Sequence, residues 1–60
     1  MKIVNIESVL IYHVETDADQ YPYYRRYAGG GWEQQMGESW ESVYDDKELE
    51  ALFQRYFARG

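Results

Sequence analysis

The sequence contains no cysteine, one proline and one histidine, His13. The lack of cysteine excludes disulfides, and one histidine alone excludes a structural Cys/His zinc site. Residues 3–10 are interrupted by Asn5, Glu7 and Ser8, unlike the apolar stretch of a signal peptide, and no run approaches membrane-spanning length. We therefore expect one domain, residues 1–60, that is cytoplasmic and holds no metal and no other cofactor.

Basic residues are also scarce: six Lys and Arg stand against eleven Asp and Glu, which gives a net charge of −5. This balance disfavours duplex nucleic acid and anionic membranes as partners. Aromatic residues are abundant instead, with seven Tyr, two Trp and two Phe. A domain this small buries only about 60% of its unfolded surface, so we expect aromatic packing or a homodimer to supply the missing burial.

The clearest local signal lies near the C-terminus, where a helix is expected over residues 46–58. Asp45 is the expected N-cap, Glu48 completes a capping box, and Tyr44 and Leu49 occupy the positions of a hydrophobic staple. The apolar residues recur on one helical face: Leu49, Leu52, Phe53, Tyr56 and Phe57.

The rest of the chain predicts strands at about residues 2–15, 22–28, 31–36 and 39–43. In the first strand the alternation changes phase, which indicates either a β-bulge near Glu7 and Ser8 or a segment, residues 9–12, buried on both faces. Pro22 directs Tyr21 to an extended conformation, and Gly37 predicts a type II′ turn.

These elements predict an α+β fold: a small antiparallel β-meander of three to four strands packed against one C-terminal amphipathic helix. Part of the strand around residues 6–12 is expected in the core. The other expected core residues are Trp32, Met36, Val43, Leu49, Leu52, Phe53 and Tyr56.

The sequence lacks the ingredients of an enzyme. Its serines have no glycine elbow beside them, and His13 is expected on the surface or at a strand edge. Carboxylates such as Glu33 and Glu41 are numerous enough for acid–base chemistry, but a small meander offers little depth for a catalytic cleft. We expect no enzymatic activity.

Two stretches favour binding. The first is an aromatic and cationic run: Tyr23, Tyr24, Arg25, Arg26 and Tyr27. It has three interpretations: anchors at a protein interface, a platform for single-stranded nucleic acid, or a structural strand with tyrosines packed inward and arginines paired with acids such as Glu33 or Glu41.

The second stretch is acidic and is either a solvated surface or a docking face for a basic target. Its candidate partner-binding residues are Glu33, Glu38, Glu41, Asp45 and Asp46.

In size, acidity and lack of catalytic motifs, the chain resembles the small accessory proteins of bacteriophages and other mobile elements. That resemblance implies binding to a host protein. The leading hypothesis is a non-enzymatic protein-interaction module that modulates its partner. The alternatives are a single-stranded nucleic-acid binder that uses the Tyr/Arg strand, and surfaces used only for homodimerisation.

Overall fold

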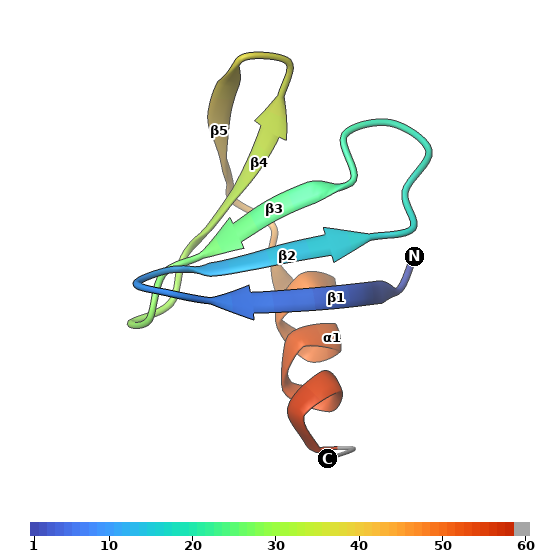
Figure 1. The fold of residues 1–60 in the computed structure, drawn as a ribbon, viewed down its shortest axis with the longest axis vertical. Coiled ribbons are helices and arrows are strands. Elements are labelled where there is room, and N and C mark those ends of the chain that lie inside the picture. The colour runs from blue at the N-terminus through green and yellow to red at the C-terminus, as the bar shows by residue number, and fades with distance from the viewer. Residues whose placement is uncertain (59–60) are drawn as a thin grey trace.

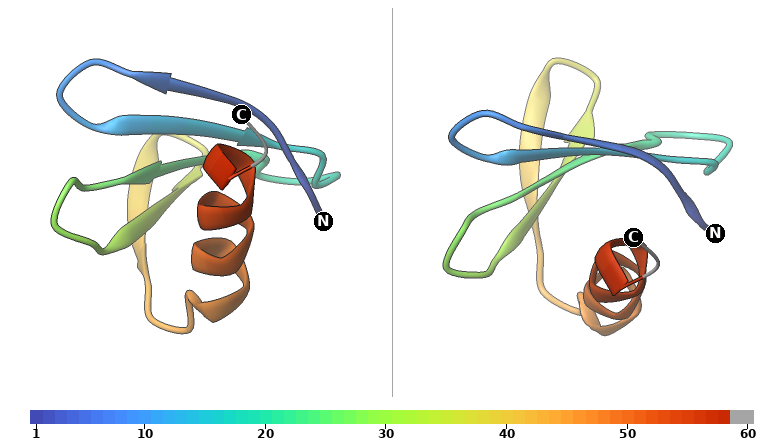
Figure 2. Two further views of the ribbon diagram at one scale, coloured as in Figure 1. Left: turned by 90° about the horizontal axis from the view of Figure 1, so that it is seen from below. Right: turned by 60° about the horizontal axis from the view of Figure 1, so that its bottom comes forward.

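The computed structural model describes residues 1–58, which form a five-stranded antiparallel sheet and one helix (Figure 1). The strands follow the chain in the order β1-β2-β3-β4-β5, and the fold is thus the expected meander with one more strand than predicted. The helix packs on one side of the twisted sheet and leaves the other side uncovered by any described element (Figure 2). The elements are β1 Ile3–Ser8, β2 Tyr12–Thr16, β3 Tyr23–Arg26, β4 Trp32–Met36, β5 Ser39–Val43 and α1 Lys47–Ala58.

The additional strand arises because the predicted first strand reverses direction at its middle. Ser8 pairs with Tyr12 across a short loop, in which Val9 is 81% exposed and Leu10 is 89% exposed. Both interpretations of the phase change were therefore wrong. The register irregularity of this hairpin lies instead between Ile3 and Asn5.

The glycine turns agree with the sequence. Gly37 has a φ of 70° while Glu38 keeps a negative φ, as a type II′ turn requires, and β4 and β5 pair from Met36 and Ser39 onward. In the β3–β4 loop, the amide of Gly30 donates to the carbonyl oxygen of Tyr27 at 3.0 Å.

The β2–β3 connection contains one unexpected backbone conformation. Tyr21 has a φ of 52°, so the prediction of an extended residue before Pro22 was wrong. The amide and hydroxyl of Thr16 both donate to the carbonyl oxygen of Pro22 at 2.9 Å, which closes this loop. Closing the loop within so few residues is what places Tyr21 in the left-handed region.

The core lies between the sheet and the helix and is largely aromatic. Phe53 makes edge-to-face contacts with Trp32 and Tyr12, at centroid distances of 5.6 and 5.1 Å. Ile3, Ile6, Tyr12 and Val43 are partly buried against it. The buried core residues are Val14, Tyr24, Trp32, Leu49 and Phe53.

This core differs from the expected one in several places. Met36 is 40% exposed because it lies at the end of β4 beside the turn, while Leu52 and Tyr56 are only partly buried. Val14 and Tyr24 belong to the core although neither was among the expected core residues. The burial of Tyr24 agrees with the interpretation in which tyrosines of the Tyr/Arg run pack inward.

Helix α1 begins within one residue of the predicted start. The carbonyl of Asp46 accepts the first helical hydrogen bond, from the amide of Glu50 at 2.8 Å, so Asp46 occupies the N-cap position in place of Asp45. Tyr44 is 95% exposed, and the predicted staple with Leu49 is therefore wrong. With 12 residues, α1 is neither long nor apolar enough to cross a membrane, and residues 1–58 contain no other helix.

Candidate functional site

The strand register divides the side chains of the sheet between two faces. One face contains Ile6, Val14 and Tyr24 and packs toward α1. The opposite side, here called the open face, presents two rows that run across the strands. The first row is Glu7, His13, Arg25, Glu33 and Ser42, and the second is Asn5, Glu15, Tyr23, Gln35 and Trp40.

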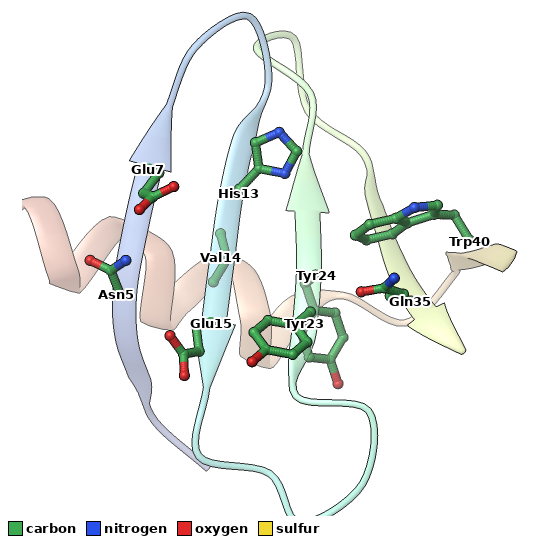
Figure 3. A pocket seen from close by; sticks show the side chains of 9 residues that line it. All are labelled: Asn5, Glu7, His13, Val14, Glu15, Tyr23, Tyr24, Gln35 and Trp40. Atoms are coloured by element: carbon green, nitrogen blue, oxygen red, sulfur yellow. The ribbon is translucent and has the colours of Figure 1, made fainter. Parts of the chain in front are cut away.

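The open face contains no aliphatic side chain, since every member of the two rows is polar or aromatic. Its centre is hollowed by a shallow pocket of about 280 Å³ (Figure 3). Val14 and Tyr24 line the pocket from the helix-facing side, and the other seven lining residues belong to the open face. The pocket thus lies on the only broad surface of the sheet that the described residues do not cover.

The cation of the open face is already engaged by its neighbours. The Nε of Arg25 donates to Glu33, the hydroxyl of Tyr27 donates to the same oxygen at 2.8 Å, and the guanidinium group lies 4.3 Å from the ring centroid of Trp40. The hydrogen bond from Arg25, followed by that from Tyr27, holds the pKa of Glu33 below its usual value. The hydrogen bond that Tyr27 donates to Glu33 also raises the pKa of Tyr27 above its usual value.

The acids on the other side of the pocket are not engaged in this way. Ion pairs within residues 1–58 join Arg25 to Glu33 and Arg26 to Glu50, and neither includes Glu7 or Glu15. Glu7 lies opposite His13 in the register, and Glu15 lies opposite Tyr23. This half of the pocket therefore combines two uncompensated carboxylates with an imidazole and a tyrosine ring.

The predicted Tyr/Arg run is split between the two faces. Tyr23 and Arg25 lie on the open face, and Tyr27, at the end of the strand, reaches Glu33. Tyr24 is buried, its hydroxyl oxygen accepts a hydrogen bond from Gln34 at 2.9 Å, and burial raises its pKa. Tyr24 is consequently a core residue rather than an exposed anchor.

Arg26 likewise makes structural contacts, here with helix α1. Its Nε and Nη2 donate to the two carboxylate oxygens of Glu50 at 2.9 and 3.0 Å, and its guanidinium group lies 4.4 Å from the ring centroid of Phe53. The expected cross-strand pair with Glu33 is formed by Arg25, whereas Arg26 pairs with the helix rather than with Glu41. Both arginines are therefore already paired with carboxylates, and neither is free to contact a nucleic-acid phosphate.

The predicted acidic face is not assembled as one surface. Glu33 belongs to the open face, Glu38 lies in the β4–β5 turn, and Glu41 pairs with Gln34 in a helix-facing row. Asp45 and Asp46 lie in the connection between β5 and α1. The structure therefore separates these five residues among several surfaces.

Sequence reasoning missed most of the pocket. Glu7, His13 and Glu15 come together because β1 and β2 form a hairpin, and the loop at Val9 and Leu10 has no glycine, proline or asparagine to indicate it. His13 is exposed as expected but lies on an interior strand of the sheet rather than at an edge. The pocket lining includes no serine, threonine or cysteine to act as a nucleophile beside His13, and residues 1–58 contain no cluster suited to a metal ion.

Together, the fold and the site define a small α+β domain in which one face of the sheet supports a helix and the other is a polar and aromatic surface. Comparison of the chain with protein-family models, curated proteins and solved structures gave no match.

Proposed function

We propose that this protein is a non-enzymatic interaction module that binds a partner protein through the open face of its sheet. The observation that carries the proposal is the composition of that face. Tyrosine, tryptophan and arginine are the residues most enriched at protein-interface hot spots, and Tyr23, Trp40 and Arg25 occur together there. Tyr23 is 49% exposed, so its ring is available for contact.

The charge of the open face indicates what kind of partner it would bind. Three carboxylates, Glu7, Glu15 and Glu33, stand against Arg25, which gives a charge of −2 with His13 neutral (1 − 3). A basic surface is therefore the complementary one, and complementary charge speeds association and selects partners. The proposal includes two further expectations. The partner is a host protein, as the resemblance to mobile-element accessory proteins implies, and the protein is cytoplasmic.

Affinity capture with two charge-matched variants tests it. Glu7→Lys changes the open face, and Glu38→Lys makes the same change in net charge at the β4–β5 turn. A partner recovered by the wild-type protein should be lost with Glu7→Lys and retained with Glu38→Lys, and its recovery should fall as salt screens the charges. Retention of the partner by Glu7→Lys, or equal loss with both variants, would contradict the proposal.

A single-stranded nucleic-acid ligand is less favoured as an alternative. The two arginines it requires are both hydrogen-bonded to carboxylates, and Tyr24 is unavailable for base stacking. Titration with labelled oligonucleotides at low salt tests this alternative, and salt-sensitive binding that Arg25→Ala abolishes would restore it.

Self-association remains a second candidate because Val9 and Leu10 are so exposed at the β1–β2 loop. A second copy of the chain could cover this apolar loop and add burial to a small domain. Sedimentation equilibrium at micromolar concentration should then show a dimer that Leu10→Ser dissociates. A wild-type protein that stays monomeric would exclude this candidate.

A further inference from the structure

We infer that the pocket on the open face binds an arginine side chain supplied by the partner protein. This inference rests on the proposed function and specifies which group of the partner the open face recognises. It depends on three observations: an arrangement of ring and carboxylate that occurs twice in the fold, the unpaired acids of the pocket, and the pocket's size.

The chain twice uses one arrangement to hold a guanidinium group. Arg25 lies on the ring of Trp40 while it donates to Glu33, and Arg26 lies on the ring of Phe53 while it donates to Glu50. A ring face together with a carboxylate is a favourable site for arginine because the flat cation stacks on one and hydrogen-bonds to the other.

The pocket repeats these ingredients without an arginine of its own. Glu15 and Tyr23 are direct cross-strand neighbours, and both line the pocket. Glu7 lies diagonally from Glu15 across the β1–β2 pair, a relation that places side chains about 7–8 Å apart. Two carboxylates at that spacing can both accept hydrogen bonds from one guanidinium group, which offers five N–H donors.

A metal ion fits the same acids less well. Within the described chain, no three carboxylate, imidazole or thiol groups are placed to hold one ion. The amide side chains of Asn5 and Gln35, which also line the pocket, suit a ligand with a hydrogen-bonding backbone. A peptide fulfils that requirement.

The volume of the pocket favours a side chain anchored by its own protein over a free small molecule. Small-molecule sites usually measure about 300–1,000 Å³ and enclose most of their ligand. At about 280 Å³ on the surface of a sheet, this pocket is just below that range, and it is partly open to solvent. An arginine held in place by neighbouring contacts of its chain needs less enclosure, since part of the entropy cost is met by those contacts.

Titration of the isotope-labelled protein with a capped glycine-serine peptide that carries one central arginine tests the inference by NMR. The largest shifts are expected at Glu15, Tyr23 and the Trp40 indole. The same peptide with lysine should bind more weakly, and citrulline, which is neutral and similar in shape, should cause no shift. Free L-arginine, which lacks the peptide backbone, should also bind more weakly than the peptide.

Glu15→Gln should weaken binding of the arginine peptide by about two- to fivefold, the range of one exposed charge pair. Glu38→Gln, at the β4–β5 turn, should leave the affinity unchanged. If Glu15→Gln does not fold, Glu7→Gln on the same pocket gives the same test. Binding should also weaken as salt is raised.

The inference is overturned if the arginine peptide causes no shift at the pocket, if citrulline or lysine binds as tightly as arginine, or if free L-arginine equals the peptide. These results differ from failure of the proposed function. A captured partner that contacts the open face while the arginine peptide does not would remove the inference alone. A partner that contacts another surface would remove both.

Discussion

Among single residues, Glu50 joins three elements of the fold through the hydrogen bonds of its carboxylate. It accepts hydrogen bonds from Arg26 on β3, from the Nε1 of Trp32 on β4, and from Gln54 one turn along α1. The hydrogen bonds from Arg26 are the main reason that the pKa of Glu50 falls from 4.5 to about 2. Glu50 thus fixes the helix against the middle of the sheet.

Glu50→Gln is expected to lower the free energy of unfolding by about 1–2 kcal/mol, because the well-buried Arg26 loses its charged partner while Glu50 itself is partly solvated. Urea titration measures the loss. Glu48→Gln, an exposed acid on the same helix, should change stability by less than about 0.5 kcal/mol.

The same residue predicts a pH dependence. Since its pKa is lower in the folded protein than its usual 4.5, Glu50 contributes stability above about pH 4.5 and loses it as the pH falls toward 2. Unfolding curves between these values should be less pH-dependent for Glu50→Gln than for the wild type. Parallel pH profiles of the two proteins would count against this role.

The left-handed backbone of Tyr21 is expected to lower the stability of the protein. A non-glycine residue at a φ of 52° costs about 1–2 kcal/mol. Tyr21→Gly should therefore leave stability unchanged or raise it, while Tyr21→Val, with a branched side chain, should lower it. Thermal unfolding of the two variants measures the difference, and a Tyr21→Gly protein less stable than Tyr21→Val would show that the ring itself stabilises the loop.

For the secondary-structure elements, the sequence predicted what local patterns determine. Helix α1, the β3, β4 and β5 strands and the turn at Gly37 all follow from periodicity or from glycine, and they are confirmed. The reversal at Val9 and Leu10 could not be predicted because it contains only apolar residues, which usually continue a strand. Because the chain reverses at this loop, β1 pairs with β2 and Glu7 lies opposite His13. The pocket was not predicted because this pairing was not predicted.

The turns give a matched pair of substitutions. Gly37→Ala places a side chain at a φ of 70°, where an added Cβ would meet no atom within 4 Å, so only the backbone opposes it. The expected loss is about 1 kcal/mol. Gly29→Ala also meets no neighbour but has no positive φ, and it should be neutral or stabilising. Equal effects of the two in urea unfolding would argue against the type II′ turn.

The whole molecule is small enough that its aromatic core decides whether it folds. Domains of this length have a free energy of unfolding of about 3–9 kcal/mol. Phe53→Ala removes a buried ring that contacts both Trp32 and Tyr12 and should cost about 3–5 kcal/mol, enough to unfold much of the population. Phe57→Ala, on a ring that is 51% exposed, should cost much less, and circular dichroism melting curves compare the two.

At this scale the two faces of the sheet differ in composition and burial. The helix-facing residues build the core, and the open face keeps carboxylates, rings and amides that the fold does not enclose. The sequence predicted one acidic docking face, and the structure instead distributes Glu33, Glu38, Glu41, Asp45 and Asp46 among several surfaces. Residues distant in sequence, such as Glu7 and Gln35, come to line one pocket only when β1 to β4 pair in order.

The most direct test of this division is the footprint of a captured partner on the isotope-labelled protein, measured as amide and side-chain shifts. We predict that the perturbed residues lie on the open face, with Glu15, Tyr23 and Trp40 among them, and that the exposed side of α1 is unaffected. Shifts centred on α1 or on the loop at Val9 and Leu10, with the open face unchanged, would contradict it.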